Sequence, residues 1–226
     1  MNYKINCVEL KENQYSEQYS KFIFKYLEHG QGITLANSLR RILLSEIEGI
    51  AIVAVRIAGI NNEFSGIPGV KEDILEIILN LKQIVLKGNI DKPILARLKI
   101  QGPAIVTADL IDATEIKIIN PSQYIATISD KSILEMEFKI EKGKNYKLSD
   151  LKSLEDPIDF LQIDSIFNPV TKVIYEIKEI NRFSKSIKEK LILKIWTNGS
   201  ILPSEALFLS GNIIQNLTQP LILNNY

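Results

Sequence analysis

The sequence predicts an α+β fold in which a domain of two main helices packed on an antiparallel sheet is interrupted by an inserted β-rich domain. Apolar residues recur with helical spacing in only a few separated stretches, whereas the other apolar runs are short and bounded by turn-forming residues. The two longest helical stretches lie near opposite ends of the chain, with the β-rich stretch between them. This order is typical of a core that is built from both termini around an insertion.

The first helical stretch follows a tight glycine turn, and we expect Thr34 as its N-cap and Gly49 as its stop. At about 100° per residue, the stretch has one wide apolar face that should pack against its own domain. The members of this apolar face are Leu35, Leu39, Ile42, Leu43, Ile47 and Ile50.

The opposite face of this helix is mixed, because it combines Leu44 with the polar side chains of Asn37, Arg41 and Glu48. A second face of this kind is suited to contact a partner. The alternative is that Arg41 and Leu44 are ordinary surface residues, since single exposed leucines are common in folded proteins. Helix geometry alone leaves both interpretations open.

Strands are predicted in several regions. Ser20–Glu28 alternates aromatic with basic residues, and we expect Phe22, Phe24 and Tyr26 on its buried side. The other expected strands lie at 51–60, in short runs between 84 and 140, at 173–180 and at 191–197, with mostly loop at 141–168.

Two further helices are predicted. Val70–Leu81 returns to helical spacing, and Glu72 and Asp73 fall in its first turn, where the helix dipole favours acids. Pro203 suits a first helical position, and Pro220 should end this last helix.

The overall charge argues against a nucleic-acid-binding protein. Lysine and arginine total 27 and aspartate and glutamate total 27, whereas proteins that hold nucleic acid usually carry a basic excess. A single cysteine, Cys7, permits no internal disulfide, and a lone His29 argues against a zinc site. No apolar run approaches the roughly 20 residues that span a membrane, so no membrane partner is expected.

The sequence has no convincing catalytic motif. Gly30 and Gly32 precede a helix as in a dinucleotide site, but Leu35 occupies the third glycine position and no acid ends the next strand. Asp156 and Asp159 are better explained as solvated surface acids. We therefore expect no cofactor, no metal and no small-molecule substrate, which indicates a non-enzymatic interaction protein.

Four segments together resemble the alpha subunit of bacterial-type, multisubunit RNA polymerase. They occur in the order and at the spacing of that family and cover nearly the whole chain, and the first two are long and specific. They are GQGITLANSLRRILLSEIEG (30–49), GVKEDILEIILNLK (69–82), NPV (168–170) and TNGSILPSEAL (197–207). The chain departs from the family at Ile33, Ala36 and Ser38, where His, Gly and Ala are common, and at Gln83, usually Gly.

The resemblance is to the amino-terminal assembly half of that subunit, and it implies a dimerisation domain, about 1–48 plus 171–226, interrupted by an inserted domain, 49–170. It implies a homodimer on which the beta and beta-prime subunits assemble. The chain would then serve a nucleotidyltransferase without catalytic residues of its own, and would reach DNA only through the assembled enzyme. Family members usually carry a further carboxy-terminal DNA-binding domain, which we do not expect in a chain that ends at Tyr226.

The resemblance also implies interface residues. Those implied for the dimer are Leu35, Leu39, Ile42, Leu43, Leu209, Ile213 and Leu217. Those implied for the beta and beta-prime subunits are Asn37, Arg40, Arg41 and Leu44 in the first helix, and Asp73, Glu76, Asn80 and Lys82 in the inserted domain.

The chain looks similar to plastid-encoded copies in algae, because it uses many Ile, Asn and Lys residues, as an A/T-rich gene would. A plastid is therefore the expected location, with a bacterial cytoplasm as the alternative. Two other functions stay open: an autonomous homodimeric adaptor unrelated to transcription, and a small nucleotide-dependent enzyme. Co-purification of two very large subunits separates the first function from the adaptor, and ligand binding would reveal the enzyme.

Overall fold

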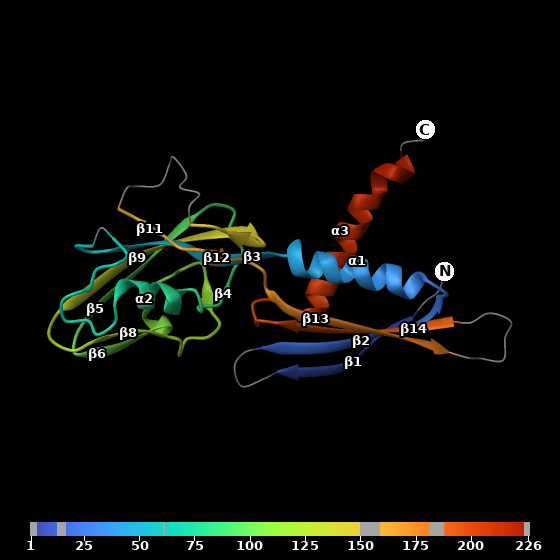
Figure 1. Cartoon of the computed structure of the whole chain (residues 1–226), viewed down its shortest axis with the longest axis horizontal. Helices are drawn as coiled ribbons and strands as arrows, with labels where there is room; N and C mark the ends of the chain where they lie inside the picture. The colour runs from blue at the N-terminus through green and yellow to red at the C-terminus, as the bar shows by residue number, and fades with distance from the viewer. Residues whose placement is uncertain (1–3, 13–16, 61, 150–158, 181–187, 224–226) are drawn as a thin grey trace. The chain divides into compact units, whose positions relative to one another are not determined.

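The chain divides into two compact units in the computed structural model, one formed by residues 1–47 and 168–226 and the other by residues 48–167. We call them the terminal unit and the inserted unit. Both consist mainly of antiparallel strands with few helices (Figure 1), which confirms the predicted α+β class. The residues that the structure describes are 4–12, 17–60, 62–149, 159–180 and 188–223.

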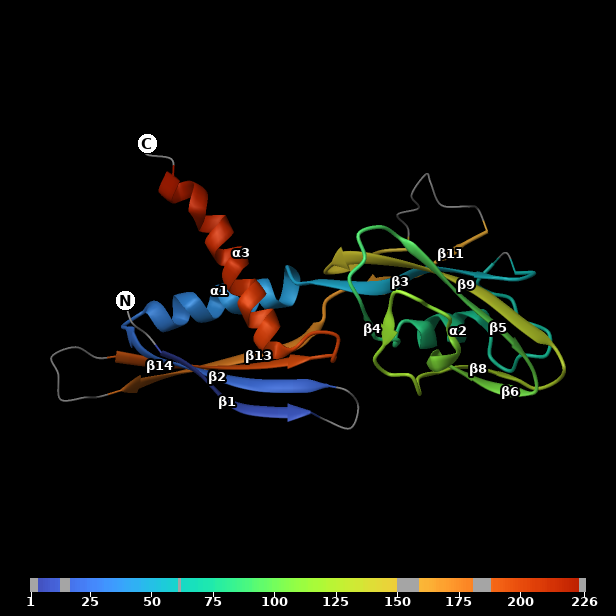
Figure 2. The ribbon, with the colours of Figure 1, turned by 180° about the vertical axis from the view of Figure 1, so that it is seen from behind.

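The terminal unit is a four-stranded antiparallel sheet with both of its helices on one side (Figures 1 and 2). Two neighbouring strands come from the N-terminal end of the chain and the other two from the C-terminal end, so neither end can form the sheet alone. The strand order is β1 (Lys4–Glu12), β2 (Gln18–Glu28), β14 (Lys188–Thr197) and β13 (Val170–Ile180). The helices are α1 (Gln31–Ser45) and α3 (Pro203–Leu223).

The core of the terminal unit lies between this sheet and α1. On the two central strands, Phe22 lies opposite Leu193 and Phe24 opposite Leu191, and all four side chains are buried. They pack in one cluster with Leu43, which is 0% exposed. Burying one such side chain contributes about 1.5–3 kcal/mol, so the helix is held mainly by this apolar face.

The side of β2 that faces the core changes near its end. Tyr26 was expected on the buried side, but it is exposed, and Leu27 is buried instead. The reason is an irregularity in the pairing: Lys190 lies opposite Lys25 and Glu189 opposite Leu27, which leaves Tyr26 as an extra residue with a φ of 70°. An inserted residue of this kind reverses the alternation of side chains along a strand.

Helix α1 begins earlier than expected. Its N-cap is Gly30, with a φ of 82°, rather than Thr34, whose hydroxyl lies inside the first turn and donates to the Gly30 carbonyl at 3.1 Å. The side chain of Glu189 on β14 supplies the cap, because its carboxylate accepts the backbone N–H groups of Gly30 and Gly32, each at 2.8 Å. A Cβ at position 32 would lie 2.6 Å from this carboxylate, so a larger residue there would displace the carboxylate from the cap.

The end of α1 also differs from the prediction. The helix ends at Ser45, with Glu46 as C-cap, and Gly49 lies in the following strand, β3 (Glu48–Ile57). Asn168 holds this end of the helix, because its amide donates to the Leu44 carbonyl at 2.7 Å.

Replacing Glu189 with glutamine is expected to lower the free energy of unfolding of the terminal unit by about 2 kcal/mol at pH 7, since hydrogen bonds to a charged group contribute about 1.5–3 kcal/mol. The Gly30 N–H lowers the pKa of Glu189 and outweighs the effect of burial, and the Gly32 N–H lowers it further. Because the folded pKa lies below the ordinary value of 4.5, this stabilisation is present at neutral pH and is lost as the pH falls through the folded value.

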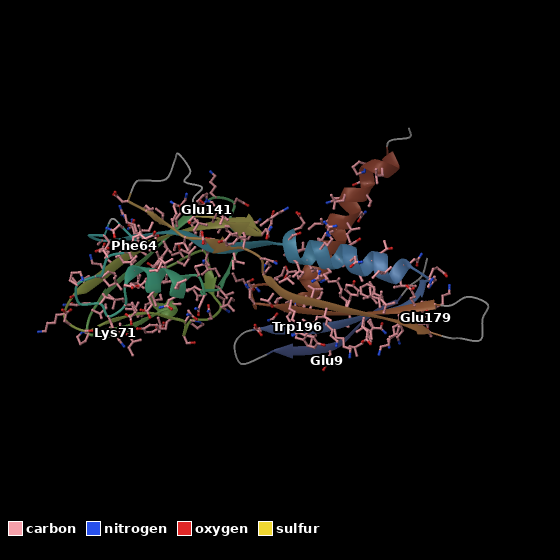
Figure 3. The ribbon with its side chains drawn as sticks, viewed as in Figure 1. Glu9, Phe64, Lys71, Glu141, Glu179 and Trp196 are labelled. Atoms are coloured by element: carbon pink, nitrogen blue, oxygen red, sulfur yellow. The ribbon has the colours of Figure 1, made fainter. Side chains whose placement is uncertain are left out.

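Urea unfolding followed through the fluorescence of Trp196, the single tryptophan, measures this effect in the terminal unit. Glu179→Gln is the matched control, because Glu179 lies opposite Glu189 across the strand pair but is exposed (Figure 3). An unchanged unfolding midpoint in Glu189→Gln would mean that the carboxylate does not cap the helix.

The inserted unit is built on a second four-stranded antiparallel sheet, whose central strands are β3 and β9 (Ile133–Lys144). Its core combines Met136 and Phe138 of β9 with side chains of the helix α2 (Ile74–Leu81). The sheet is completed by β11 (Leu161–Gln162) and β5 (Ile94–Gln101). The two-stranded pairs are β10 (Tyr146–Lys147) with β12 (Ser165–Ile166), β4 (Leu86–Lys87) with β7 (Lys117–Ile118), and β6 (Ala104–Thr107) with β8 (Tyr124–Ile128).

Helix α2 begins later than the predicted Val70. Asp73 is its N-cap and accepts the backbone N–H of Glu76 at 2.8 Å. Glu72 lies before the helix and is buried, where its carboxylate accepts the N–H of Thr127 at 2.6 Å and the hydroxyl of Tyr124. Burial raises the pKa of Glu72, but the hydrogen bonds from Tyr124 and Thr127 outweigh it and lower the pKa.

Helix α3 continues through Pro220, which was expected to end it, to Leu223. Proline cannot donate to the carbonyl four residues earlier, but that carbonyl belongs to Asn216 on an exposed part of the helix, where water can bond to it. The lost hydrogen bond is therefore inexpensive at this position, and the helix is longer than the proline rule predicts.

Candidate subunit interfaces

A groove of about 440 Å³ lies between α1 and α3 in the terminal unit. Its α1 side includes Arg41 and Ile42, and its α3 side includes Ile213, Ile214 and Leu217. The guanidinium of Arg41 is exposed and has no carboxylate within ion-pair distance among the described residues. The groove thus joins an apolar strip with an unpaired planar cation, a combination suited to a protein partner.

The mixed face predicted around Arg41 does not form as one patch. The Leu44 side chain is half-buried and packs against the core, and Glu48 belongs to β3 rather than to the helix. The amide oxygen of Asn37 accepts the hydroxyl of Tyr175 at 2.9 Å. Helical spacing therefore misplaced the neighbours of Arg41, because it assumed that the helix continues to Gly49.

Arg40 and Arg41 lie on different sides of α1. Arg41 shares the groove with Ser38 and Ser45, three and four residues away, whereas Arg40 does not line it. Both arginine side chains are exposed. The two residues, although adjacent in sequence, therefore offer their charges to different surfaces.

The residues expected in the dimer interface fall into two groups. Leu39 and Leu43 are 3% and 0% exposed within one copy, so they have almost no surface left for a second copy. Their burial by the sheet of their own chain accounts for the apolar face of α1 without a partner. The members that still offer surface or line the groove are Leu35, Ile42, Leu209, Ile213 and Leu217.

Helix α3 exposes more apolar side chains than the three that were predicted for the dimer interface. Phe208 is 67% exposed and Leu221 73% exposed, beside Leu209 at 37% and Leu217 at 65%. Phe208 was already visible as an apolar residue of this helix, whereas Leu221 was overlooked because Pro220 was expected to end the helix before it. The pattern is an apolar helix whose later turns have no core of their own to pack against.

The residues expected on α2 have mostly structural partners. Asp73 caps the helix, Asn80 donates to the Ile125 carbonyl at 3.0 Å, and Lys82 lies 3.7 Å from Asp164. Glu76 is exposed.

Sequence reasoning missed two exposed residues of the same helix, Leu75 and Leu79, which are 46% and 52% exposed. Their spacing of four residues, opposite the buried face of α2, was the signal that could have revealed them.

The comparisons with known proteins agree with this architecture. The family described as the RNA polymerase Rpb3/RpoA insert domain matches residues 55–168. All but the last of these residues belong to the inserted unit. The chain is 53% identical over 219 residues to the DNA-directed RNA polymerase subunit alpha of Cyanophora paradoxa, which covers 96% of this chain and 70% of that protein. This chain belongs to the family of DNA-directed RNA polymerase alpha subunits.

Other alpha subunits show the same extent of similarity. The protein of Porphyra purpurea is 52% identical over 216 residues, 95% of this chain and 70% of its own length. That of the cyanobacterium Trichodesmium erythraeum is 51% identical over 218 residues, 95% of this chain and 69% of its own length. Similar alpha subunits therefore occur in algae and in cyanobacteria, which fits a plastid or a bacterial cytoplasm.

Membership of the family confirms the resemblance seen in the sequence and connects the chain to a nucleotidyltransferase of several subunits. Within the described ranges, no group of three or more His, Cys, Asp or Glu side chains is placed to hold a metal ion. In the same part of the chain, no helix combines the length and apolar character needed to cross a membrane. The features that stand out in this alpha subunit are instead its exposed apolar helices and exposed arginines.

Proposed function

We propose that this alpha subunit is the non-catalytic scaffold of its RNA polymerase: two copies pair through their terminal units, and the pair binds the beta and beta-prime subunits. The observation that carries the proposal is α3, a helix with Phe208, Leu217 and Leu221 each at least 65% exposed in one copy. Isolated folded chains rarely expose so much apolar surface on one helix, and a second identical helix would cover it.

The beta and beta-prime subunits have two candidate contact regions. The first is on α1, where Arg41 in the groove is the main candidate and Arg40 on another side of the helix a lesser one, since arginine is frequent among the residues that anchor protein interfaces. The second is the exposed side of α2, where Leu75 and Leu79 flank the carboxylate of Glu76. The plastid is the proposed location, because algal alpha subunits are among the relatives and the chain has the composition of an A/T-rich gene.

Co-expression of the tagged chain with the beta and beta-prime subunits tests the proposal. We expect a complex that contains two alpha copies and one copy of each large subunit, and a homodimer when the chain is expressed alone. A homodimer that recovers neither large subunit would support the autonomous adaptor instead. A chain that stays monomeric alone and in the complex would contradict the pairing.

Leu79→Glu is expected to weaken capture of the large subunits about tenfold without changing the stability of the inserted unit. The side chain is 52% exposed, so the substitution opens no core, whereas an unpaired carboxylate in an apolar contact is costly. Leu95→Glu is the matched control, because Leu95 is 58% exposed in the same unit but lies on β5. Equal capture by the two variants would remove α2 from the proposed contact.

A further inference from the structure

The sheet of the terminal unit has a second face, opposite to α1 and α3, which no described element of this unit covers (Figures 1 and 2). We call it the outer face; it is the side of the sheet that carries Lys25 of β2 and Lys190 of β14. Alternation along the strands assigns its side chains, since residues directly opposite each other in neighbouring strands point to the same side.

Four lysines form one row across the outer face. Lys25 lies opposite Lys190, and each of them has a further lysine on its other side, so that every strand of the sheet contributes one. The order across the sheet is Lys4, Lys25, Lys190 and Lys178. Like charges directly opposite each other destabilise a sheet. A row of this kind therefore costs stability in the free chain, and an anionic ligand would offset the cost.

Three more lysines extend the positive surface. Lys21 and Lys194 oppose each other on the two central strands, and Lys172 lies on β13. The register places three described carboxylates on this face, Glu9, Glu28 and Glu176, and Glu28 pairs with Lys188.

These carboxylates neutralise only part of the positive charge of this face. Glu9 lies 3.9 Å from Lys21, and Glu176 lies 3.0 Å from Lys178. In the part of the chain that the structure describes, Lys25 and Lys190 have no carboxylate within ion-pair distance. The outer face thus keeps a strong excess of positive charge.

Two aromatic side chains, one on each central strand, lie near one end of this face. Tyr19 of β2 and Trp196 of β14 oppose each other, with ring centroids 4.8 Å apart. The ammonium of Lys172 lies 5.2 Å from the centroid of the Trp196 ring. Both rings are half-buried, so each keeps some surface open to a ligand (Figure 3 labels Trp196).

We propose that the outer face binds single-stranded nucleic acid. The lysines would contact phosphates, and unpaired bases would stack on Tyr19 and Trp196. An open four-stranded sheet that combines basic side chains with aromatic rings on its central strands has the two elements that single-strand binding uses, an electrostatic track and a stacking surface. The fold sorts the charges of a neutral chain, so the total charge of zero conceals a basic face.

The aromatic pair distinguishes this ligand from two others. Bases in a duplex are already stacked on each other and cannot reach the rings, so duplex DNA would use the lysines alone. An acidic peptide would also need only the lysines, because a carboxylate gains nothing from the face of an aromatic ring. Single strands alone engage both parts of the outer face.

The test uses the full-length chain and the fluorescence of Trp196, the single tryptophan of the sequence. Oligouridylate and oligothymidylate of about 12 nucleotides, within the usual size of single-strand sites, serve as RNA and DNA probes. Both are expected to quench Trp196 and to raise the anisotropy of a label on the oligonucleotide. A duplex of equal length is expected to bind more weakly and without quenching.

The double variant Lys25→Ala and Lys190→Ala is expected to bind about 25-fold more weakly than the unchanged chain at roughly 0.1 M salt. Each phosphate contact contributes about 0.7 to the logarithm of affinity at about 0.1 M salt relative to about 1 M, and the variant loses two such contacts. The same variant should unfold no more easily than the unchanged chain, because it removes opposed like charges. Lys87→Ala with Lys117→Ala is the matched control: these exposed lysines also oppose each other, but in the β4–β7 pair of the inserted unit.

Three results would overturn the proposal. The first is an absence of single-strand binding at micromolar concentration in low salt. The second is an equal loss of affinity in the Lys87 and Lys117 control, which would indicate diffuse attraction to any lysine. The third is quenching of Trp196 by a duplex or by polyglutamate as strong as that by oligouridylate, which would indicate a duplex or an acidic protein as the partner.

Discussion

A chain that carries Leu217→Glu is expected to have the mass of one copy in solution, whereas the unchanged chain has the mass of two. Leu217 is 65% exposed on α3 and lines the groove beside Ile42 and Ile213, so its side chain is available to a second copy. In a two-fold interface the substitution occurs twice. Losing two buried leucine contacts removes about 3–6 kcal/mol, which weakens pairing roughly a hundredfold to ten-thousandfold.

Light scattering at micromolar concentration measures the mass. Ile105→Glu is the matched control, because Ile105 is 66% exposed but belongs to β6 of the inserted unit, and this variant should keep the mass of two copies. Unfolding followed through Trp196 should show that Leu217→Glu remains folded. If Leu217→Glu keeps the mass of two copies, the pair forms through another surface.

The choice of Leu217 depends on the structure. From the sequence, Leu39 was the natural position for a charged substitution, because it lies at the centre of the apolar face of α1. Leu39 is only 3% exposed within one copy, and a carboxylate there would have to enter the core. Leu39→Glu would therefore unfold the terminal unit, and its loss of pairing would carry no information about the interface.

Local patterns were sufficient for the class of the fold but not for the ends of its elements. The apolar spacing of α1 correctly predicted that Leu39 and Leu43 are buried. Its N-cap could not be predicted from neighbouring residues, because the capping carboxylate of Glu189 comes from a strand more than 150 positions away in the chain. Pro220 was misjudged for the opposite reason, since a local rule was applied where solvent relieves its cost.

The candidate interfaces likewise combine features that local patterns predict with features that depend on distant parts of the chain. Helical spacing alone could not reveal that Leu44 packs inward or that Arg41 lines a groove with α3, because both facts depend on how the rest of the terminal unit packs against α1. The outer face depends on pairing even more strongly. Lys25 and Lys190 belong to strands from opposite ends of the chain, and only the register makes them neighbours.

Arg41→Ala is expected to weaken binding of the beta subunit by about 2 kcal/mol or more, roughly thirtyfold, while the alpha pair keeps its mass. The guanidinium is exposed and has no carboxylate within ion-pair distance among the described residues, so its removal opens no core. A planar fork of donors can bind a carboxylate or a carbonyl pair in a geometry that an ammonium cannot reproduce. Arg41→Lys should therefore recover only part of the affinity.

Arg40→Ala is the matched control for this prediction, since Arg40 is the adjacent residue, is equally charged and exposed, and lies outside the groove. At about 100° per residue, Arg40 lies nearer the apolar face of α1 than Arg41, so helix geometry alone predicts a larger effect of Arg40→Ala on stability. The exposure of Arg40 in the structure instead predicts a change within about 0.5 kcal/mol in the free energy of unfolding, and a smaller effect on beta binding than that of Arg41→Ala. Because Arg41 shares the groove with Ile213 and Leu217, beta affinity and alpha mass must be measured on the same samples. An Arg41→Ala chain that falls to the mass of one copy would place Arg41 in the alpha pair, and one that binds beta normally would leave it an ordinary surface residue.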